Sequence, residues 1–435
     1  MSVPSAKAVK EGDGRLTFQE AMGLVPLLDR TIDDGKVVKR YMSRRKVWVS
    51  NKDLIPLAME HGVGPIKTGT SAYGGHVYSQ AGLAASRAFR ATQRVEHDSS
   101  QEKKKTFGIH TIHGFFSEAG LDDRPFIYEA TSLASNALFP NLLVTARQPT
   151  SPSINPEGDH YVPADADLPL GPVCFSALVS FRPAGVSQLD VQEPSPQTRF
   201  ASILNARRPT DWAPAPITDI DGVLAILPGA RQAVGLFPGV EMRKVDMRAY
   251  NADRPLHERR ELILYRLLAP LPTTNTMTKS DDNNNNNKSE GRKGGGKDGG
   301  GEEDEEGFGG DDGADAHILA HAYAADRNGL LMLSNHAGFG FELARAASLS
   351  YSFVVHVDVE DAVMTYGDGD GDDDEWWVQE ACFPRVRAGR GIIHSKIWSP
   401  RGVHVATEYQ DGIVRRRPRP GDRDDKAKGK DREKL

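Results

Sequence analysis

The sequence contains little cysteine and no long apolar run. Its 435 residues include two cysteines, Cys174 and Cys382, which both lie in apolar, strand-like runs. Two cysteines do not make a disulfide framework, so we expect buried free thiols in a reducing compartment. No run of about 18 apolar residues is present, and residues 1–14 lack the apolar core of a secretory signal. These absences predict a soluble protein that is not secreted and does not span a membrane.

A basic surface and a serine-hydrolase motif are also missing. The formal net charge is −6, and no basic stripe is interleaved with aromatic residues. We therefore expect no nucleic-acid partner. The pattern Gly-x-Ser-x-Gly does not occur, so a serine hydrolase with a nucleophile elbow is not expected either.

The length predicts more than one globular unit, because single domains rarely reach this size. Composition divides the chain into a flexible N-terminus, a first domain, a proline-rich connection, a second domain and a charged tail, at 1–14, 15–182, 183–236, 237–414 and 415–435. Two polar insertions interrupt the second domain, at 273–314 and 366–375. The first holds asparagine and glycine runs and should be disordered, because it cannot bury enough apolar area to offset its chain entropy.

The first domain is expected to contain one long helix and several strands. Small or apolar residues recur at helical spacing at Val77, Ala81, Ala84, Ala85 and Ala88. Strand candidates follow at 107–116, 126–133, 141–147 and 172–182. In the last of them polar and apolar residues alternate, as in a half-buried antiparallel strand. We interpret this half as a central helix wrapped by strands.

The second domain repeats that order. Its expected strands are short apolar runs, at 240–250, 260–268, 348–358, 375–383, 391–399 and 403–409. An alanine-rich helix is expected over 315–327, with Asp315 as the N-cap and Asn328-Gly329 as its end. Asp326 then lies in the last turn, where the negative end of the helix dipole disfavours a carboxylate. Either Asp326 has a function together with another group nearby, or it is a solvated acid at the end of a helix.

Two features resemble metal sites, and we expect neither to bind a metal. His110 and His113 are three apart on a strand, which would place them on opposite faces. The acidic loop Gly367–Asp374 lacks the glycine and distal glutamate of an EF-hand, and we interpret it as a hairpin tip.

Several short motifs follow one another along the chain. They are Gly74–Ala81 (GGHVYSQA), His110–Phe116 (HTIHGFF), Tyr323–Asn328 (YAADRN), Ala347–Ser352 (ASLSYS) with His356, Glu375–Trp377 (EWW) and Gln410–Gly412 (QDG). In this order they resemble the motifs of the type II acyl-CoA thioesterases. The resemblance implies an α+β fold of two hotdog domains in tandem, each an antiparallel sheet around a central alanine-rich helix. It also implies an acyl-CoA substrate and no cofactor; the oligomeric state stays open, with a homo-oligomer as one alternative.

The resemblance also assigns roles to residues. In the family an aspartate, a hydroxyl and a glutamine hold the attacking water, and the matching positions are Asp326, Ser348 and Gln410. A thioester carbonyl is already electrophilic, so a proton acceptor and two orienting groups suffice. The first helix would begin at Gly74, Gly75 and His76, which we assign to substrate binding, with a plain tight turn as the alternative.

The chain departs from the family at two places. Ser132–Pro140 replaces the usual Arg-Asp-Gly-x-Ser-aromatic motif, and Val354-Val355 replaces Trp-Phe. Both changes affect the expected acyl pocket. The C-terminal Glu433–Leu435 is similar to a peroxisomal address except for its glutamate, so we expect a cytoplasmic or peroxisomal enzyme of fatty acid metabolism.

Two other functions stay open. A hotdog hydratase uses Asp-x-Asn-x-x-His, of which Asp326 and Asn328 fit the first half, but Leu331 stands where the base should be. A non-catalytic acyl-CoA binder is the second alternative.

Overall fold

The computed structural model describes most of the chain outside its polar tracts. The described residues are 15–32, 35–49, 71–97, 106–134, 138–155, 157–215, 237–271, 313–327, 329–339, 342–366 and 376–417. Most of the first insertion, the acidic loop, most of the tail and both chain ends lie outside them. The expectations for those segments therefore stay predictions.

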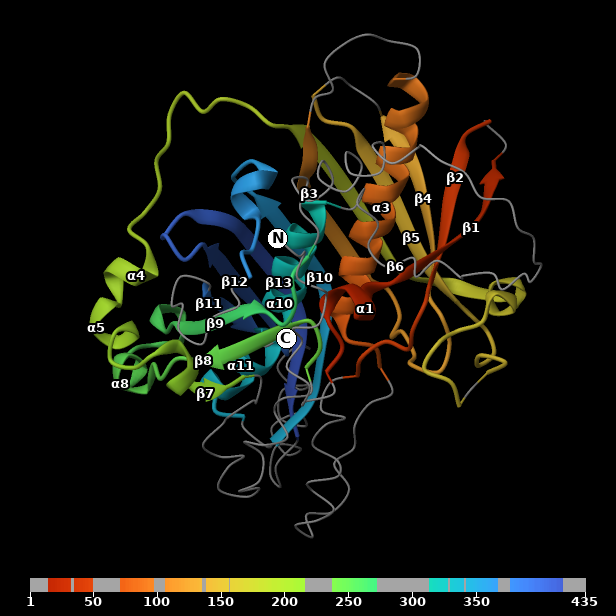
Figure 1. Ribbon diagram of the computed structural model, residues 1–435. Helices are drawn as coiled ribbons and strands as arrows, with labels where there is room; N and C mark the ends of the chain where they lie inside the picture. Colours follow the sequence, from red (N-terminus) through yellow and green to blue (C-terminus); the bar gives the residue numbers. More distant parts are fainter. Residues whose placement is uncertain are drawn as a thin grey trace, which may run out of the picture.

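Thirteen strands of the described residues form one sheet, in the order β1-β2-β4-β5-β6-β3-β10-β13-β12-β11-β9-β8-β7 (Figure 1). The first six are β1 (Leu24–Thr31), β2 (Val37–Ser43), β4 (Ile127–Ala134), β5 (Asn141–Pro149), β6 (Leu170–Pro183) and β3 (Phe107–Phe116). The other seven are β10 (Leu343–Val355), β13 (His404–Arg416), β12 (Arg390–Trp398), β11 (Trp377–Arg387), β9 (Glu261–Leu267), β8 (Val240–Lys244) and β7 (Ala213–Pro214). Neighbouring strands pair antiparallel, which confirms the expected antiparallel sheet.

The two halves of the sheet meet at β3 and β10. These strands pair over five residues, with Ser352 opposite His113 at the centre. On either side the order is the same: β2-β4-β5-β6-β3 in one half corresponds to β9-β11-β12-β13-β10 in the other. The strand order of the two halves is thus the same.

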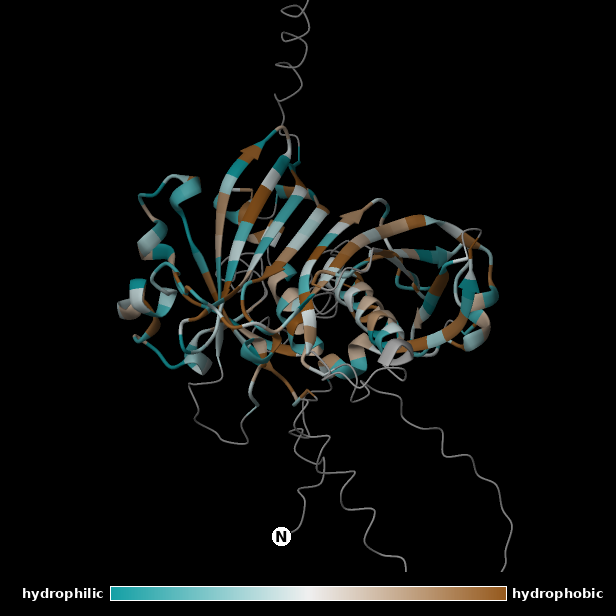
Figure 2. Ribbon diagram, turned by 90° about the horizontal axis from the view of Figure 1, so that it is seen from above, coloured by the Kyte–Doolittle hydropathy of each residue, from teal (hydrophilic) through white to brown (hydrophobic). Residues whose placement is uncertain are grey.

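Helices α3 (Gly74–His97) and α10 (Asp315–Asp326) pack on one face of this sheet. The small-residue stripe of α3 is completely buried, with Ala81, Ala84 and Ala85 at 0% exposure. The two helices also contact each other at Gly82 of α3. Leu319 of α10 packs so closely against this glycine that a Cβ there would lie 2.4 Å from Leu319 Cδ2. In Figure 2 the strands of one half curve around the long helix α3.

Tyrosine hydroxyls tie the helices to the strands. Tyr351 of β10 donates a hydrogen bond to the carbonyl oxygen of Ala322 in α10 (2.9 Å), and Tyr128 of β4 donates to Gln80 Oε1 in α3 (2.9 Å). These two buried hydroxyls therefore find acceptors and fix the position of each helix on the sheet.

Smaller elements complete the fold. Short α-helices are α1 (Phe18–Met22), α4 (Pro196–Arg199), α5 (Ala201–Leu204), α8 (Arg248–Asn251) and α11 (Gly329–His336), and single 3-10 turns lie at Pro163–Asp167, Pro209–Asp211, Leu256–Glu258 and Val359–Ala362. The described part of the proline-rich connection contains α4, α5 and the edge strand β7. No helix in the described ranges combines the length and hydropathy needed to cross a bilayer.

The alanine-rich helix differs from the prediction at both ends. Ala314, not Asp315, is its N-cap residue. The Asp315 carboxylate is buried and accepts hydrogen bonds from Ser86 Oγ (2.5 Å), Arg90 (2.7 Å) and the Ile109 N–H (2.8 Å), so it joins α3, β3 and α10. At the other end α10 stops at Asp326, and Gly329, which was expected to mark the end of the helix, begins the next helix, α11.

Two predictions about side-chain placement were wrong. Cys382 is not buried but partly exposed, whereas Cys174 is buried as expected. His110 and His113 lie on the same, outer face, because a β-bulge between Ile109 and Thr111 shifts the alternation. His110 Nδ1 lies 3.4 Å from Ser180 Oγ, and His113 Nδ1 lies 3.0 Å from Ser352 Oγ.

Candidate active site

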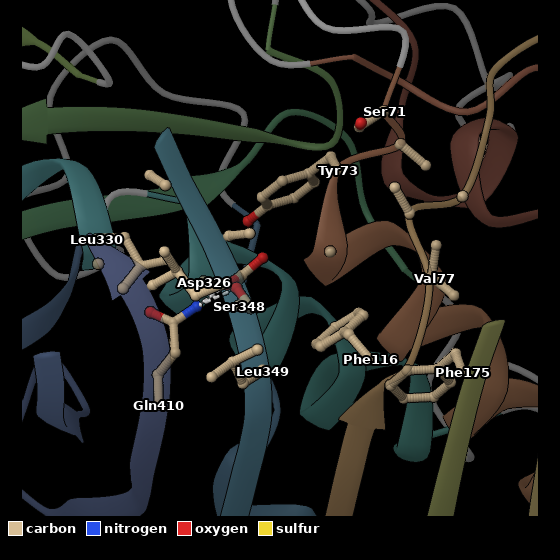
Figure 3. A pocket seen from close by; sticks show the side chains of 18 of the residues that line it. Ser71, Tyr73, Val77, Phe116, Phe175, Asp326, Leu330, Ser348, Leu349 and Gln410 are labelled. Carbon is tan, nitrogen blue, oxygen red and sulfur yellow. Dashed lines mark hydrogen bonds between the residues drawn. The ribbon is translucent and has the colours of Figure 1, made fainter. Parts of the chain in front are cut away.

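A cavity of about 710 Å³ lies where the two halves meet. It is bounded by the start of α3, the end of α10, helix α11 and the first part of β10. Asp326, Ser348 and Gln410 lie on one side of it, and Val77, Phe116 and Phe175 on the other (Figure 3).

Asp326 lies between two helix ends. It is the last residue of α10, and its Oδ2 accepts a hydrogen bond from the Gly75 N–H in the first turn of α3 (2.6 Å). The unfavourable end of its own helix is thus offset by the positive end of a second, 24-residue helix. Gly74 allows this approach, because a Cβ there would lie 3.1 Å from Asp326 Oδ2 and 3.2 Å from Phe116 Cζ.

One amide joins the three predicted catalytic residues. Gln410 Nε2 donates to Asp326 Oδ1 (2.5 Å) and to Ser348 Oγ (2.8 Å). The –NH₂ group has two hydrogens, so both bonds can exist together. The opposite amide orientation is disfavoured, because it would place the carbonyl oxygen of Gln410 against a carboxylate.

A bulge in β10 brings Ser348 into this group. Tyr351 and Phe353 point to the helix side of the sheet, so simple alternation would turn Ser348 to the outer side. The register with β13 shifts between Ser348 and Ser350, which turns Ser348 toward Gln410. The shift reverses the face of the part of β10 that precedes it, so Ala346, paired with Val414, changes face together with Ser348.

Burial changes the protonation of the acids in this region. Burial raises the pKa of Asp326 to about 6, although its hydrogen bonds from Gly75 and Gln410 and the charge of Arg327 oppose the rise. Arg327 itself lies over the rings of Trp48 (4.5 Å) and Phe237 (4.9 Å). Asp326 is therefore mostly ionised at neutral pH, although its pKa lies close to neutral pH.

A second acid lies two residues from Gln410 on the same face of β13. Glu408 is completely buried, and burial raises its pKa to about 8; the charge of Asp326 adds to the rise. At neutral pH Glu408 is mostly uncharged, whereas Asp326 is mostly charged.

The three residues assigned to substrate binding have different positions. Gly74 lines the cavity, and the Gly75 N–H is bonded to Asp326. The ring of His76 is 1% exposed and does not line the cavity, and burial lowers its pKa to about 3. Leu331, where a hydratase would have its base, lines the cavity as an apolar residue. In the described parts of the chain, no group of three or more His, Cys, Asp and Glu residues is placed to hold a metal.

Sequence reasoning did not find three parts of this cavity. Helix α11 contributes Leu330, which fits against β13 because Gly412 has no side chain: a Cβ there would lie 2.5 Å from Leu330 Cδ2. The aromatic pair Phe116 and Phe175 and the exposed Arg345 also line it. The glycines opposite α11 were the signal available in the sequence.

Comparison with known proteins finds similar solved structures. No protein-family model matches the sequence, and no curated protein matches it. The solved structures that the chain resembles include type II acyl-CoA thioesterases and a hotdog-fold protein, at low sequence identity.

Three of these structures illustrate the likeness. An acyl-CoA thioesterase II from Mycobacterium marinum is 18% identical, with 93% of this chain and 99% of that chain covered and a TM-score of 0.47. A putative thioesterase II from Thermobifida fusca is 13% identical, with the same coverage and TM-score. A hotdog-fold protein of unknown function from Alicyclobacillus acidocaldarius is 13% identical, with 92% and 97% covered and a TM-score of 0.46.

Proposed function

We propose that the chain is an acyl-CoA thioesterase that hydrolyses a fatty acyl-CoA to the free fatty acid and CoA. The observation that carries the proposal is the Gln410 amide, which donates to both Asp326 and Ser348 at the wall of a cavity. A carboxylate, a hydroxyl and an amide held together in this way can orient and deprotonate one water molecule. The sequence motifs that contain these residues resemble those of the type II acyl-CoA thioesterases.

In the proposed reaction the Asp326 carboxylate accepts a proton from water while the water oxygen attacks the thioester carbon. Ser348 Oγ, which accepts a hydrogen bond from Gln410, retains its own hydrogen and orients the water. When the C–S bond breaks, the leaving CoA sulfur takes the proton from Asp326. The negative charge that develops on the carbonyl oxygen faces the N-terminal turn of α3, whose helix dipole favours it.

The same proposal covers the domain organisation. We assign residues 15–182 and 237–414 to two hotdog domains in tandem, with α3 and α10 as their central helices. The repeated strand order and the burial of both helices support this division. Gly74 and Gly75 would accommodate the substrate through their backbone, and no cofactor is required.

Three measurements separate the proposal from its alternatives. Release of free thiol from a saturated acyl-CoA, followed with a thiol-reactive dye, is the expected result. Hydration of an enoyl-CoA without thiol release would favour the hydratase, which Leu331 argues against. Binding of acyl-CoA without turnover would favour a non-catalytic binder, which the intact Asp326, Ser348 and Gln410 argue against.

A further inference from the structure

The cavity extends past Asp326 into a buried apolar region between α3 and the strands β3 and β6. We name this region the aromatic arm; the side chains around it are Val77, Phe116, Phe126, Cys174 and Phe175. Four of them are closed off from solvent: Val77 is 4% exposed, Phe126 and Phe175 are 1% exposed, and Cys174 is 7% exposed. Phe116 is partly exposed and stands at the entrance of the arm. In Figure 3 Phe116 lies between the catalytic residues and Phe175.

The backbone of β3 and β6 forms this arm. Phe116 and Phe175 are directly opposite each other in the ladder, and their ring centroids are 4.8 Å apart. Gly114 makes room for the ring of Phe175, because a Cβ there would lie 2.7 Å from Phe175 Cζ. The register of β6 with β5 shifts next to Cys174, so Cys174 and Phe175 both line the cavity although they are adjacent.

The chemistry of the arm suits a hydrocarbon chain. The five side chains of the arm are aliphatic or aromatic except Cys174, whose thiol donates to the Ala146 carbonyl oxygen (3.3 Å). Beside Cys174 the cavity is also lined by the exposed Ser117 and Glu118, whose N–H groups donate to the Cys174 carbonyl oxygen. A polar group on the ligand would therefore lose its water without gaining a partner in the arm. The entrance is next to the catalytic carboxylate, because the Phe116 ring and Asp326 Oδ2 both lie within 3.2 Å of the point where a Gly74 Cβ would be.

The opposite end of the cavity has the character that a polar headgroup needs. Ala344, Arg345 and Ala346 of β10 line it and are exposed. Before Ser350, β10 pairs with β13 but has no ladder to β3. The exposed edge offers backbone hydrogen bonds, and Arg345 offers a positive charge.

We propose that the aromatic arm receives the acyl chain of the substrate and that Phe175 sets the longest chain it accepts. This inference rests on the proposed thioesterase function. The thioester lies beside Asp326, the first carbons of the chain pass the ring of Phe116, and the far end of a straight saturated chain reaches Phe175. The CoA portion then lies toward Arg345. The substrate class is a straight acyl chain of limited length without polar substituents near its end.

The test is the chain-length profile of kcat/KM over a series of straight saturated acyl-CoAs. With the wild-type protein we expect kcat/KM to rise by about fourfold per methylene, the equivalent of ~0.8 kcal/mol, until the arm is full and then to fall. Phe175→Ala should move the maximum to longer chains. Val77→Phe, which fills the arm, should move it to shorter chains and keeps the test valid if Phe175→Ala does not fold.

The matched control is Phe181→Ala. Phe181 is a buried ring on the same strand, stacked on Phe89 at 4.4 Å, and it does not line the cavity. It should lower stability without moving the maximum. If the wild-type protein hydrolyses no acyl-CoA, the thioesterase proposal fails. If it hydrolyses them and the maximum stays in place in both Phe175→Ala and Val77→Phe, only the assignment of the arm is overturned.

Discussion

Replacement of Asp326 by asparagine removes the proton acceptor from the proposed site and keeps the shape of the side chain. The two carboxylate oxygens accept hydrogen bonds from the Gly75 N–H (2.6 Å) and from Gln410 Nε2 (2.5 Å). Asparagine has one acceptor oxygen, so one of these bonds is lost, at about 1.5–3 kcal/mol for a bond to a charged group. Loss of a buried charge offsets part of this cost, because burial disfavours the ionised form. The variant should therefore fold.

The expected effect on catalysis is larger than the effect on folding. Positioned proton transfer contributes roughly 10²- to 10⁴-fold, so kcat of Asp326→Asn should fall by that factor while the affinity for acyl-CoA stays close to that of the wild-type protein. Thiol release measured at saturating acyl-CoA gives kcat, and titration calorimetry with the inactive variant gives affinity.

Asp315→Asn is the matched control for this experiment. It makes the same chemical change at the other end of α10, where the carboxylate is also buried but is bonded to Ser86, Arg90 and the Ile109 N–H. The control should lower the melting temperature and leave kcat per folded molecule unchanged. Near-normal turnover of Asp326→Asn, with the control also active, would refute Asp326 as the base.

Four further predictions follow from the geometry. In the wild-type protein kcat/KM should rise with pH through about 6, because Asp326 must be ionised to accept a proton; a pH-rate profile that is flat through pH 6 would contradict this. Gly329→Ala should lower kcat on the order of 10²-fold in the thiol-release assay, because its Cβ would lie 2.2 Å from Gln410 Oε1 and would displace that amide. The pKa of Glu408 is raised from 4.5 to about 8, so its contribution to stability is present below pH 4.5 and is lost as pH rises through about 8; Glu408→Gln should abolish that fall, up to about 5 kcal/mol, in unfolding titrations at several pH values. Arg345→Gln should raise KM severalfold for acyl-CoA but not for acyl thioesters of N-acetylcysteamine, which lack the CoA phosphates; equal effects on both substrates would argue against a headgroup contact.

Strand positions could be predicted from the sequence where the pattern is local. In β6 the alternation of apolar and polar residues predicts which side chains face the core, and Phe175, Ala177, Val179 and Phe181 are buried as expected. The period of two is a property of the extended backbone itself, so it does not depend on the partner strand. The small-residue stripe of α3 was also predictable, because the period of the helix is likewise a property of its own backbone.

Bulges were not predictable in this way. At Ser348, His110 and Cys174 a register shift against a neighbouring strand changes the face that a side chain points to. The shift depends on how two strands that are distant in sequence align, and no local periodicity records it. For this reason the strand alternation wrongly predicted His110 and His113 on opposite faces. For the same reason the alternation of β10 alone would not place Ser348 beside Gln410.

The sequence by itself determined the alternating strands and the two small-residue helices, and its motifs predicted Asp326, Ser348 and Gln410 as the residues that hold the water. Only the tertiary structure decided that α3 directs its N-terminal turn at Asp326, across 251 positions of sequence, and that an apolar arm opens behind Phe116. The physical reason is one of range. Secondary structure follows from interactions between near neighbours, whereas the charge of a buried carboxylate and the shape of a cavity follow from groups brought together by the whole fold.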